Sequence, residues 1–110
     1  SRGFILAAAL AERRRKGFVP IRKKGKLPPP IVDRRYDLEY GSGVLEMQRG
    51  HGRLLLIDDV LATGGTLSAS ALLAVDAGFR VERLGVLIDL GLAPEFRWQG
   101  LAARTVIRYG

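Results

Sequence analysis

Residues 54–66, LLLIDDVLATGGT, form the stretch that decides the fold of this chain. Its first four residues are apolar and predict a buried strand, and an acidic pair, Asp58 and Asp59, follows directly. A glycine-rich turn then leads into a helix. Because ligands of α/β sheets bind at the carboxyl ends of the strands, this order of elements is typical of a binding site for a phosphorylated sugar.

The turn and the acidic pair suit the two ends of one ligand. The turn has small residues whose backbone N–H groups can approach a phosphate at the positive end of the next helix: Ala62, Thr63, Gly64, Gly65 and Thr66. The carboxylates of Asp58 and Asp59 accept hydrogen bonds from vicinal hydroxyls or lie near a metal ion. A ligand with a 5-phosphate and two ribose hydroxyls satisfies both halves. The alternative is an ordinary strand-to-helix connection with an acidic N-cap, which many α/β domains contain.

Other common sites are disfavoured by the sequence. It contains no G-x-x-x-x-G-K-[ST] loop, and residues 41–46, GSGVLE, lack the last glycine of a dinucleotide fingerprint. Serine-type hydrolysis at the lone His51 has no G-x-S-x-G elbow to support it, and the flanking glycines predict an exposed turn. Trp98 is predicted to belong to the core or to an interface.

Size and composition predict one small α/β domain. The chain has 110 residues, of which 47% are hydrophobic, and this length suits a single core. The absence of cysteine removes disulfides and thiol chemistry and fits a reducing cytoplasm. No apolar run approaches the roughly 18 residues that a membrane-spanning helix needs. We therefore expect a soluble, cytoplasmic protein.

The net charge of +7 makes polyanions plausible partners. Residues 13–16, RRRK, fall in the last turn of a predicted helix, where cations complement the helix dipole, so they are interpreted as a solvated end. A second group brackets Gly25 after a short strand and is better placed to grip a compact anion such as a polyphosphate: Arg22, Lys23, Lys24 and Lys26.

Strands that alternate with helices predict an α/β fold with a parallel sheet flanked by helices. The first helix is expected over residues 3–16, with Gly17 at its C′ position and Ile5, Leu6, Ala9 and Leu10 facing inward. The second is expected over residues 66–77, ended by Gly78, with Leu67, Ala71, Leu72, Ala74 and Val75 facing inward. Strands are expected at residues 18–22, 54–57, 84–90 and 105–109.

A flexible β-hairpin loop is predicted between the first short strand and the central strand. Residues 31–36 and 44–48 form two extended arms around residues 38–43, and Gly41 and Gly43 would let the tip bend. Three consecutive prolines, residues 28–30, make the entry stiff. The tip would act as a lid.

The 54–66 string closely resembles the phosphoribosyl-pyrophosphate (PRPP) loop of type I phosphoribosyltransferases. Three further segments are similar, in the same order, to motifs of the adenine phosphoribosyltransferase family: residues 1–4, SRGF; residues 21–28, IRKKGKLP; and residues 36–41, YDLEYG. In that family they are the pyrophosphate-contact turn, the basic segment and the flexible catalytic loop. The resemblance covers nearly the whole chain.

The resemblance implies a role for each site residue. Residues 62–66 would hold the 5-phosphate, and Asp58 and Asp59 would hold the ribose hydroxyls. Glu39 resembles the loop carboxylate that assists proton movement at the purine, and Tyr40 a residue that closes over PRPP. Three basic residues would face pyrophosphate: Arg2, Arg22 and Lys26.

The implied reaction joins N9 of adenine to C1 of PRPP and gives AMP and pyrophosphate, as in purine salvage. Mg²⁺ would arrive with PRPP and need no direct protein ligand, and a homodimer is expected. Full chains of the family begin with an N-terminal hood, which supplies much of the base pocket, whereas this sequence starts at the SRGF turn. Residues 1–110 are therefore expected to form a single phosphoribosyltransferase core domain that lacks the hood.

A second hypothesis comes from the positive charge. A non-catalytic relative of the same fold would keep PRPP binding as a sensor and bind nucleic acid. Glu39 distinguishes the two hypotheses, because a sensor needs no carboxylate over the base while an enzyme does. The enzyme is therefore favoured, and nucleic acid is not expected as a partner.

Overall fold

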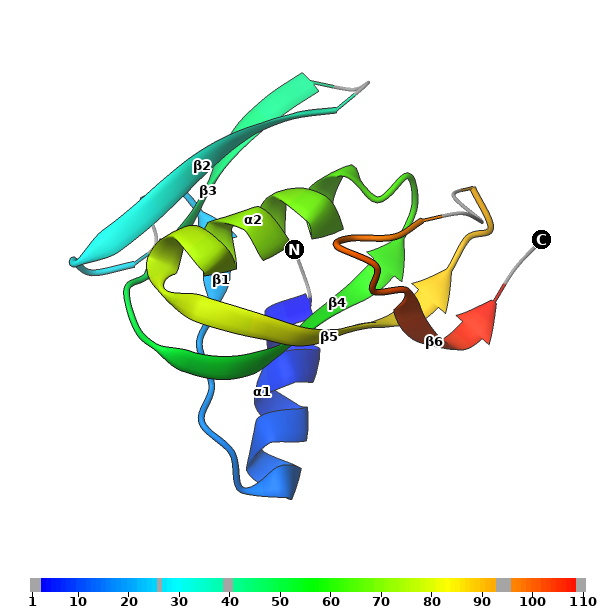
Figure 1. Cartoon of the computed structure of the whole chain (residues 1–110), viewed down its shortest axis with the longest axis horizontal. Coiled ribbons are helices and arrows are strands. Elements are labelled where there is room, and N and C mark those ends of the chain that lie inside the picture. Colours follow the sequence, from blue (N-terminus) through cyan, green and yellow to red (C-terminus); the bar gives the residue numbers. More distant parts are fainter. Residues whose placement is uncertain (1–2, 26, 39–40, 93–95, 109–110) are drawn as a thin grey trace.

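The computed structural model describes residues 3–25, 27–38, 41–92 and 96–108 (Figure 1). Within these residues the chain forms two helices and two three-stranded sheets. In chain order the elements are α1 (Gly3–Arg14), β1 (Ile21–Lys23), β2 (Ile31–Leu38), β3 (Gly41–Gln48), β4 (Gly52–Leu61), α2 (Gly65–Ala77), β5 (Phe79–Asp89) and β6 (Ala103–Arg108).

The predicted parallel sheet is confirmed and has the order β4-β5-β6. Its strands are longer than predicted. β4 continues to Leu61, so Asp58 and Asp59 lie inside the strand near its carboxyl end instead of following it. Pairing with β5, such as Asp58 opposite Val86, uses backbone groups, and a polar side chain does not interrupt it. β5 begins at Phe79, directly after the glycine that ends α2.

The predicted hairpin is confirmed as part of a separate antiparallel sheet. β2 pairs with β3 from Ile31 opposite Gln48 to Leu38 opposite Gly41, and β1 pairs with the other edge of β3. β1 covers only the end of the strand predicted at residues 18–22, since Pro20 has no N–H group to donate to a ladder. The tip residues Glu39 and Tyr40 lie outside the described residues.

Helix α2 lies between the two sheets, and Figure 1 shows the hairpin on one side of it and the parallel sheet on the other. Burial therefore extends around most of the helix instead of along one stripe. The predicted inward position of Val75 is wrong, because its side chain is 45% exposed. The predicted end is confirmed: Gly78 adopts φ of 110°, and its N–H bonds the carbonyls of Ala74 and Val75. The buried residues are Leu67, Ala69, Ser70, Ala71, Leu73, Ala74 and Ala77.

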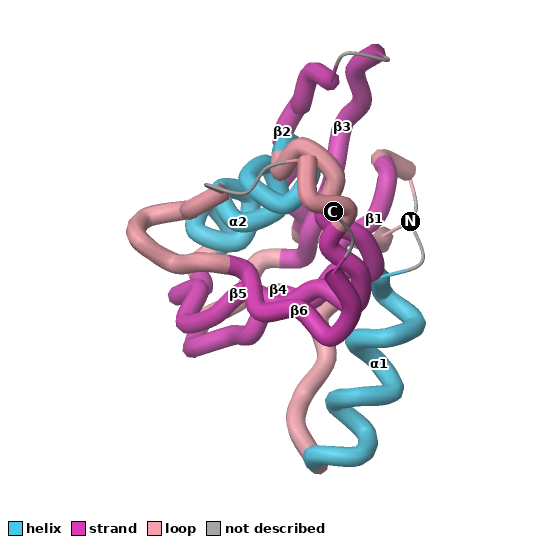
Figure 2. Tube along the Cα trace, turned by 90° about the vertical axis from the view of Figure 1, so that its right-hand side faces the viewer, coloured by secondary structure: helices cyan, strands magenta, loops and turns pink. Residues whose placement is uncertain are grey.

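Helix α1 packs against β4, on the other side of the parallel sheet from α2 (Figure 2). The predicted inward stripe is wrong for Ile5, which is 60% exposed, and for Ala9. The half-buried residues are Leu6, Ala7, Ala8, Leu10 and Ala11.

The end of α1 also differs from the prediction, which put Gly17 at C′. The helix ends at Arg14, and Arg15 takes the left-handed conformation with φ of 54°. The N–H of Arg15 bonds the Glu12 carbonyl at 3.2 Å, and the N–H of Lys16 bonds the Ala11 carbonyl at 2.9 Å. This is the Schellman pattern, completed two residues before the glycine.

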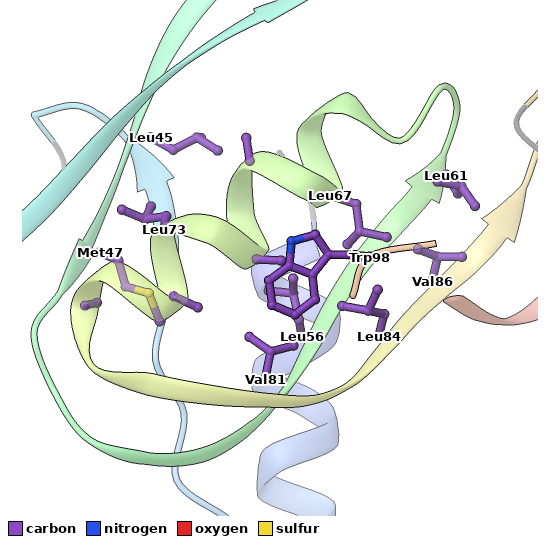
Figure 3. Packing of buried hydrophobic residues seen from close by; sticks show 14 residues of the cluster. Leu45, Met47, Leu56, Leu61, Leu67, Leu73, Val81, Leu84, Val86 and Trp98 are labelled. Atoms are coloured by element: carbon purple, nitrogen blue, oxygen red, sulfur yellow. The ribbon is translucent and has the colours of Figure 1, made fainter. Parts of the chain in front are cut away.

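The hydrophobic core joins both sheets through α2 (Figure 3). Met47 of β3, Leu73 of α2 and Leu84 of β5 are its most completely buried large residues, each under 2% exposed. Trp98, from the segment before β6, is buried in the same cluster. It was predicted to lie in the core or at an interface, and the structure places it in the core. Leu56 and Leu61 of β4 belong to the same cluster, so the core includes the strand that carries the acidic pair.

Candidate active site

The acidic pair is held by its own backbone. The N–H of Asp59 donates to Oδ1 of Asp58 at 2.8 Å, and the N–H of Val60 donates to Oδ1 of Asp59 at 2.9 Å. Both residues are half-buried near the carboxyl end of β4. These bonds orient the two carboxylates at the sheet edge where a ligand of an α/β fold binds.

The glycine-rich loop follows directly and leads into α2, whose N-terminus has no side-chain cap. Gly64 is the N-cap of α2, has φ of 92° and provides no side-chain cap, so the N–H groups of the first turn have no side-chain acceptor there. The first helical bond runs from the N–H of Ser68 to the Gly64 carbonyl at 2.9 Å. Ala62 and Thr63 are exposed, and Gly65 and Thr66 are half-buried. The loop can therefore bind an anion through backbone N–H groups.

Phe96 supports this loop and was not predicted as a site residue. Its ring occupies the space where a Cβ on Gly64 would lie, with Cδ1 and Cε1 as the nearest atoms. The contact joins two segments that are far apart in the sequence, so no local pattern indicates it. Position 64 therefore favours glycine, both for its backbone angle and for the contact.

A third carboxylate, Asp89, lies at the end of β5 and was also missed. It is buried, and its Oδ1 accepts the N–H of Gly91 at 2.9 Å. The N–H of Leu90 bonds the Leu61 carbonyl at 3.0 Å, which ties the loops after β4 and β5 together. The signal was present in the sequence, since Asp89 ends an apolar run as Asp58 does.

The basic segment begins in β1. Arg22 is half-buried and lies opposite Glu46 of β3, while Lys24 is exposed and its Nζ lies 3.7 Å from Oδ2 of Asp33. Of the predicted site residues, four fall outside the described residues: Arg2, Lys26, Glu39 and Tyr40.

An open cleft of about 890 Å³ lies between α1 and β4 and reaches the site. Asp58 and Thr66 belong to its wall, together with apolar residues such as Leu10 and Leu55. His51 lies at this wall and is exposed, as predicted for a residue of a solvent-facing turn. The rest of the wall is partly apolar and partly charged, so the cleft is mixed in character.

The donor set suits Mg²⁺ when the ion arrives with a phosphorylated ligand. Mg²⁺ commonly takes one or two carboxylates and completes its shell with phosphate oxygens and water, and Asp58 and Asp59 can supply such oxygens. Within the described residues, no three His, Cys, Asp or Glu side chains gather into a metal site of their own. Neither helix in this part of the chain has the length and apolar character to cross a membrane.

Comparisons with known proteins agree on one family, although no protein-family model matches. The adenine phosphoribosyltransferase of Bdellovibrio bacteriovorus is 46% identical over 109 residues, which are 99% of this chain and 66% of that protein. The crystal structure of the Thermoanaerobacter pseudethanolicus enzyme superposes with a TM-score of 0.89 at 38% identity, over 99% of this chain and 66% of the other. This chain belongs to the adenine phosphoribosyltransferase family. It spans about two thirds of the length of these relatives.

A third adenine phosphoribosyltransferase, from Trypanosoma brucei, was solved in complex with AMP, pyrophosphate and ribose-5-phosphate. It is 28% identical to this chain, with a TM-score of 0.84, over 98% of this chain and 53% of the other. The family fold thus extends over both sheets and both helices of the chain. The predicted type I phosphoribosyltransferase fold is confirmed.

Proposed function

We propose that the protein transfers the 5-phosphoribosyl group of PRPP to adenine and releases AMP and pyrophosphate. One observation carries the proposal: the oriented acidic pair and the uncapped N-terminus of α2 lie at the two ends of one short connection, in a chain of this family. AMP, pyrophosphate and ribose-5-phosphate, which the Trypanosoma brucei relative binds, have the phosphate and hydroxyl groups that this arrangement suits.

The backbone N–H groups of residues 62–66 bind the 5-phosphate in this proposal, and the helix dipole strengthens the attraction. Asp58 and Asp59 accept hydrogen bonds from the ribose hydroxyls. A charged acceptor makes stronger hydrogen bonds than a neutral one, which favours carboxylates at these positions. The sugar is thereby held at both ends.

The bond changes define what the charged residues do. N9 of adenine forms a bond to C1 of the ribose while the C1–O bond to pyrophosphate breaks, and its electron pair leaves with pyrophosphate. The sugar becomes oxocarbenium-like, so the carboxylates of Asp58 and Asp59 lie near its positive character. The leaving group gains negative charge, which the basic residues stabilise: Arg2, Arg22 and Lys26. Mg²⁺, when it is bound with PRPP, neutralises part of this charge.

Glu39 and Tyr40 are assigned by the resemblance of the hairpin to the family's catalytic loop. Glu39 takes part in moving the N9 proton of adenine, and Tyr40 contacts PRPP. We also propose that residues 1–110 act as one core domain and that the protein works in the cytoplasm as a homodimer. The lack of cysteine fits a reducing compartment.

The test is calorimetric titration with PRPP, with and without Mg²⁺, followed by adenine. Asp58→Asn together with Asp59→Asn should weaken PRPP binding by on the order of 10- to 100-fold, since two charged hydrogen-bond acceptors become neutral. Asparagine keeps Oδ1 as an acceptor for the N–H groups of Asp59 and Val60. The circular dichroism spectrum should therefore stay the same.

Asp76→Asn is the matched control. Asp76 is an exposed carboxylate that pairs with Arg34 at 2.9 Å, and it lies in the last part of α2, away from the loop. Its removal should leave PRPP binding unchanged. Unchanged PRPP affinity in a folded Asp58→Asn, Asp59→Asn protein would contradict the proposed ribose site.

A further inference from the structure

Glu46 is a buried carboxylate that the proposed reaction does not use. It lies near the end of β3 between Leu45 and Met47, and only 1% of its surface is exposed. Burying a carboxylate is costly unless hydrogen bonds compensate for the lost water. Its location therefore calls for a structural or functional reason.

The compensating bonds go to the turn after β1. The N–H of Gly25 donates to Oε1 of Glu46 at 2.9 Å, and the N–H of Leu27 donates to Oε2 at 2.6 Å. Both carboxylate oxygens of Glu46 thus accept hydrogen bonds from the backbone of the same turn. The N–H of Lys24 also bonds the Val44 carbonyl at 3.0 Å, so this turn is fastened to β3 on two sides.

The segment held in this way is the most basic part of the sheet. Arg22 lies directly opposite Glu46 across β1 and β3, so the two side chains leave the sheet on the same face. Lys23 and Lys24 follow before the turn, and Gly25 adopts φ of 94°, which favours glycine. A carboxylate beneath clustered cations lowers their mutual repulsion.

We propose that Glu46 is a positioning residue for the leaving group: it fixes the turn after β1 and so sets Arg22 and the neighbouring backbone to receive pyrophosphate. This inference rests on the proposed function. Glu46 touches no reacting atom in it. Its effect should therefore appear in the affinity for pyrophosphate and not in the affinity for the phosphate and ribose of AMP, which the loop after β4 binds.

The test compares pyrophosphate and AMP binding by calorimetry in the unchanged protein and in Glu46→Gln. Glutamine keeps the shape but places an NH₂ group against one of the two N–H donors, so the turn loses one bond. Pyrophosphate affinity should fall on the order of 10-fold, the usual scale for a residue that orients a ligand-binding group. AMP affinity should change by less than about twofold, as expected for a site that shares no partner with Glu46.

Two further variants sharpen the test. Gly25→Ala strains the same turn and leaves the side chain of residue 46 unchanged, and a Cβ there would meet nothing within 4 Å. It should therefore also lower the pyrophosphate affinity selectively, even if Glu46→Gln fails to fold. Asp76→Asn is the matched control, because Asp76 is an exposed carboxylate of α2 that pairs with Arg34 at 2.9 Å, outside the turn after β1. It should change neither affinity.

Equal losses of pyrophosphate and AMP affinity in these turn variants would make Glu46 a support for the whole fold and overturn the inference. Unchanged pyrophosphate affinity would overturn it as well. If the unchanged protein bound neither ligand, the proposed function would fail and this inference with it. If the unchanged protein binds both ligands, a negative result in the variants contradicts only the role of Glu46 and not the proposed function.

Discussion

Gly64 is the residue that gives the loop between β4 and α2 its shape. Its φ of 92° lies in the left-handed region, and the ring of Phe96 fills the space beside it. The first condition concerns the backbone and the second concerns packing, so they act independently. Any side chain here would disturb the N–H groups that are proposed to bind the 5-phosphate.

Gly64→Ala should lower the free energy of unfolding by about 2 to 5 kcal/mol, the sum of a left-handed backbone cost and an overpacking cost. AMP affinity should fall too. Gly100→Ala is the control, because Gly100 has φ of 80° but a Cβ there meets nothing within 4 Å, so only the backbone cost of about 1 to 2 kcal/mol applies. Urea unfolding followed by circular dichroism measures both. Equal losses would mean that Phe96 does not restrict position 64.

Distance along the chain separates most of the predicted site residues from the missed ones. Asp89 is the exception, because its partner Gly91 is only two residues away and it was still not predicted. Asp58 and Asp59 bond their own neighbours, and the loop that follows is recognisable from five consecutive residues. Glu46 instead bonds a turn about twenty residues earlier, and it lies between two buried apolar residues in a strand with no simple alternation. Nothing local distinguishes it from a solvated carboxylate.

At the level of elements, α2 carries the largest share of the packing. It contacts strands of both sheets, which is why its burial does not follow one stripe. The start and end of α2 and its place after β4 were predicted from glycines and from apolar content. Both are features of the local sequence. Which residue faces outward depends on how many surfaces cover the helix, and the sequence does not contain that information in a readable form.

Leu73→Ala should therefore cost about 2 to 5 kcal/mol of stability, because Leu73 is fully buried in the core around α2. Val75→Ala, two residues on, removes a half-exposed side chain and replaces it with a better helix former, so stability should change by less than about 1 kcal/mol. Thermal unfolding of both variants distinguishes them. A larger loss for Val75→Ala would contradict the observed orientation of the helix.

The division into two sheets illustrates the same limit. The hairpin arms and the parallel strands were each predicted, but strand pairing joins segments that are far apart, such as β1 with β3. The extra length of β4 and β5 has the same cause, since their ends are set by the partner strand. The types of these elements were accessible from the sequence, and the ends of the paired strands were not.

At the level of the whole molecule, the charge of +7 allows a test of the rival function, a PRPP sensor that binds nucleic acid. Arg13, Arg14 and Lys16 at the end of α1 are exposed and would attract any polyanion. The enzyme hypothesis predicts weak oligonucleotide binding, with Kd no tighter than about 10⁻⁶ M at physiological salt and no sequence preference. Fluorescence anisotropy with two unrelated duplexes, at about 50 and 200 mM salt, measures this. Tight binding of one duplex only would favour the sensor.

The position of α2 has one more consequence, which concerns how the molecule opens. Neither sheet has a core of its own, because the same helix supplies the opposing surface for both. If the antiparallel sheet separated, the apolar surface that α2 presents to it would meet water, which would weaken the packing of α2 on the parallel sheet. Amide protons of β3 and of β4 should therefore exchange with solvent through one shared global event, as a single cooperative unit. The population of molecules with a formed loop between β4 and α2 is thus set in part by strands that do not belong to that loop.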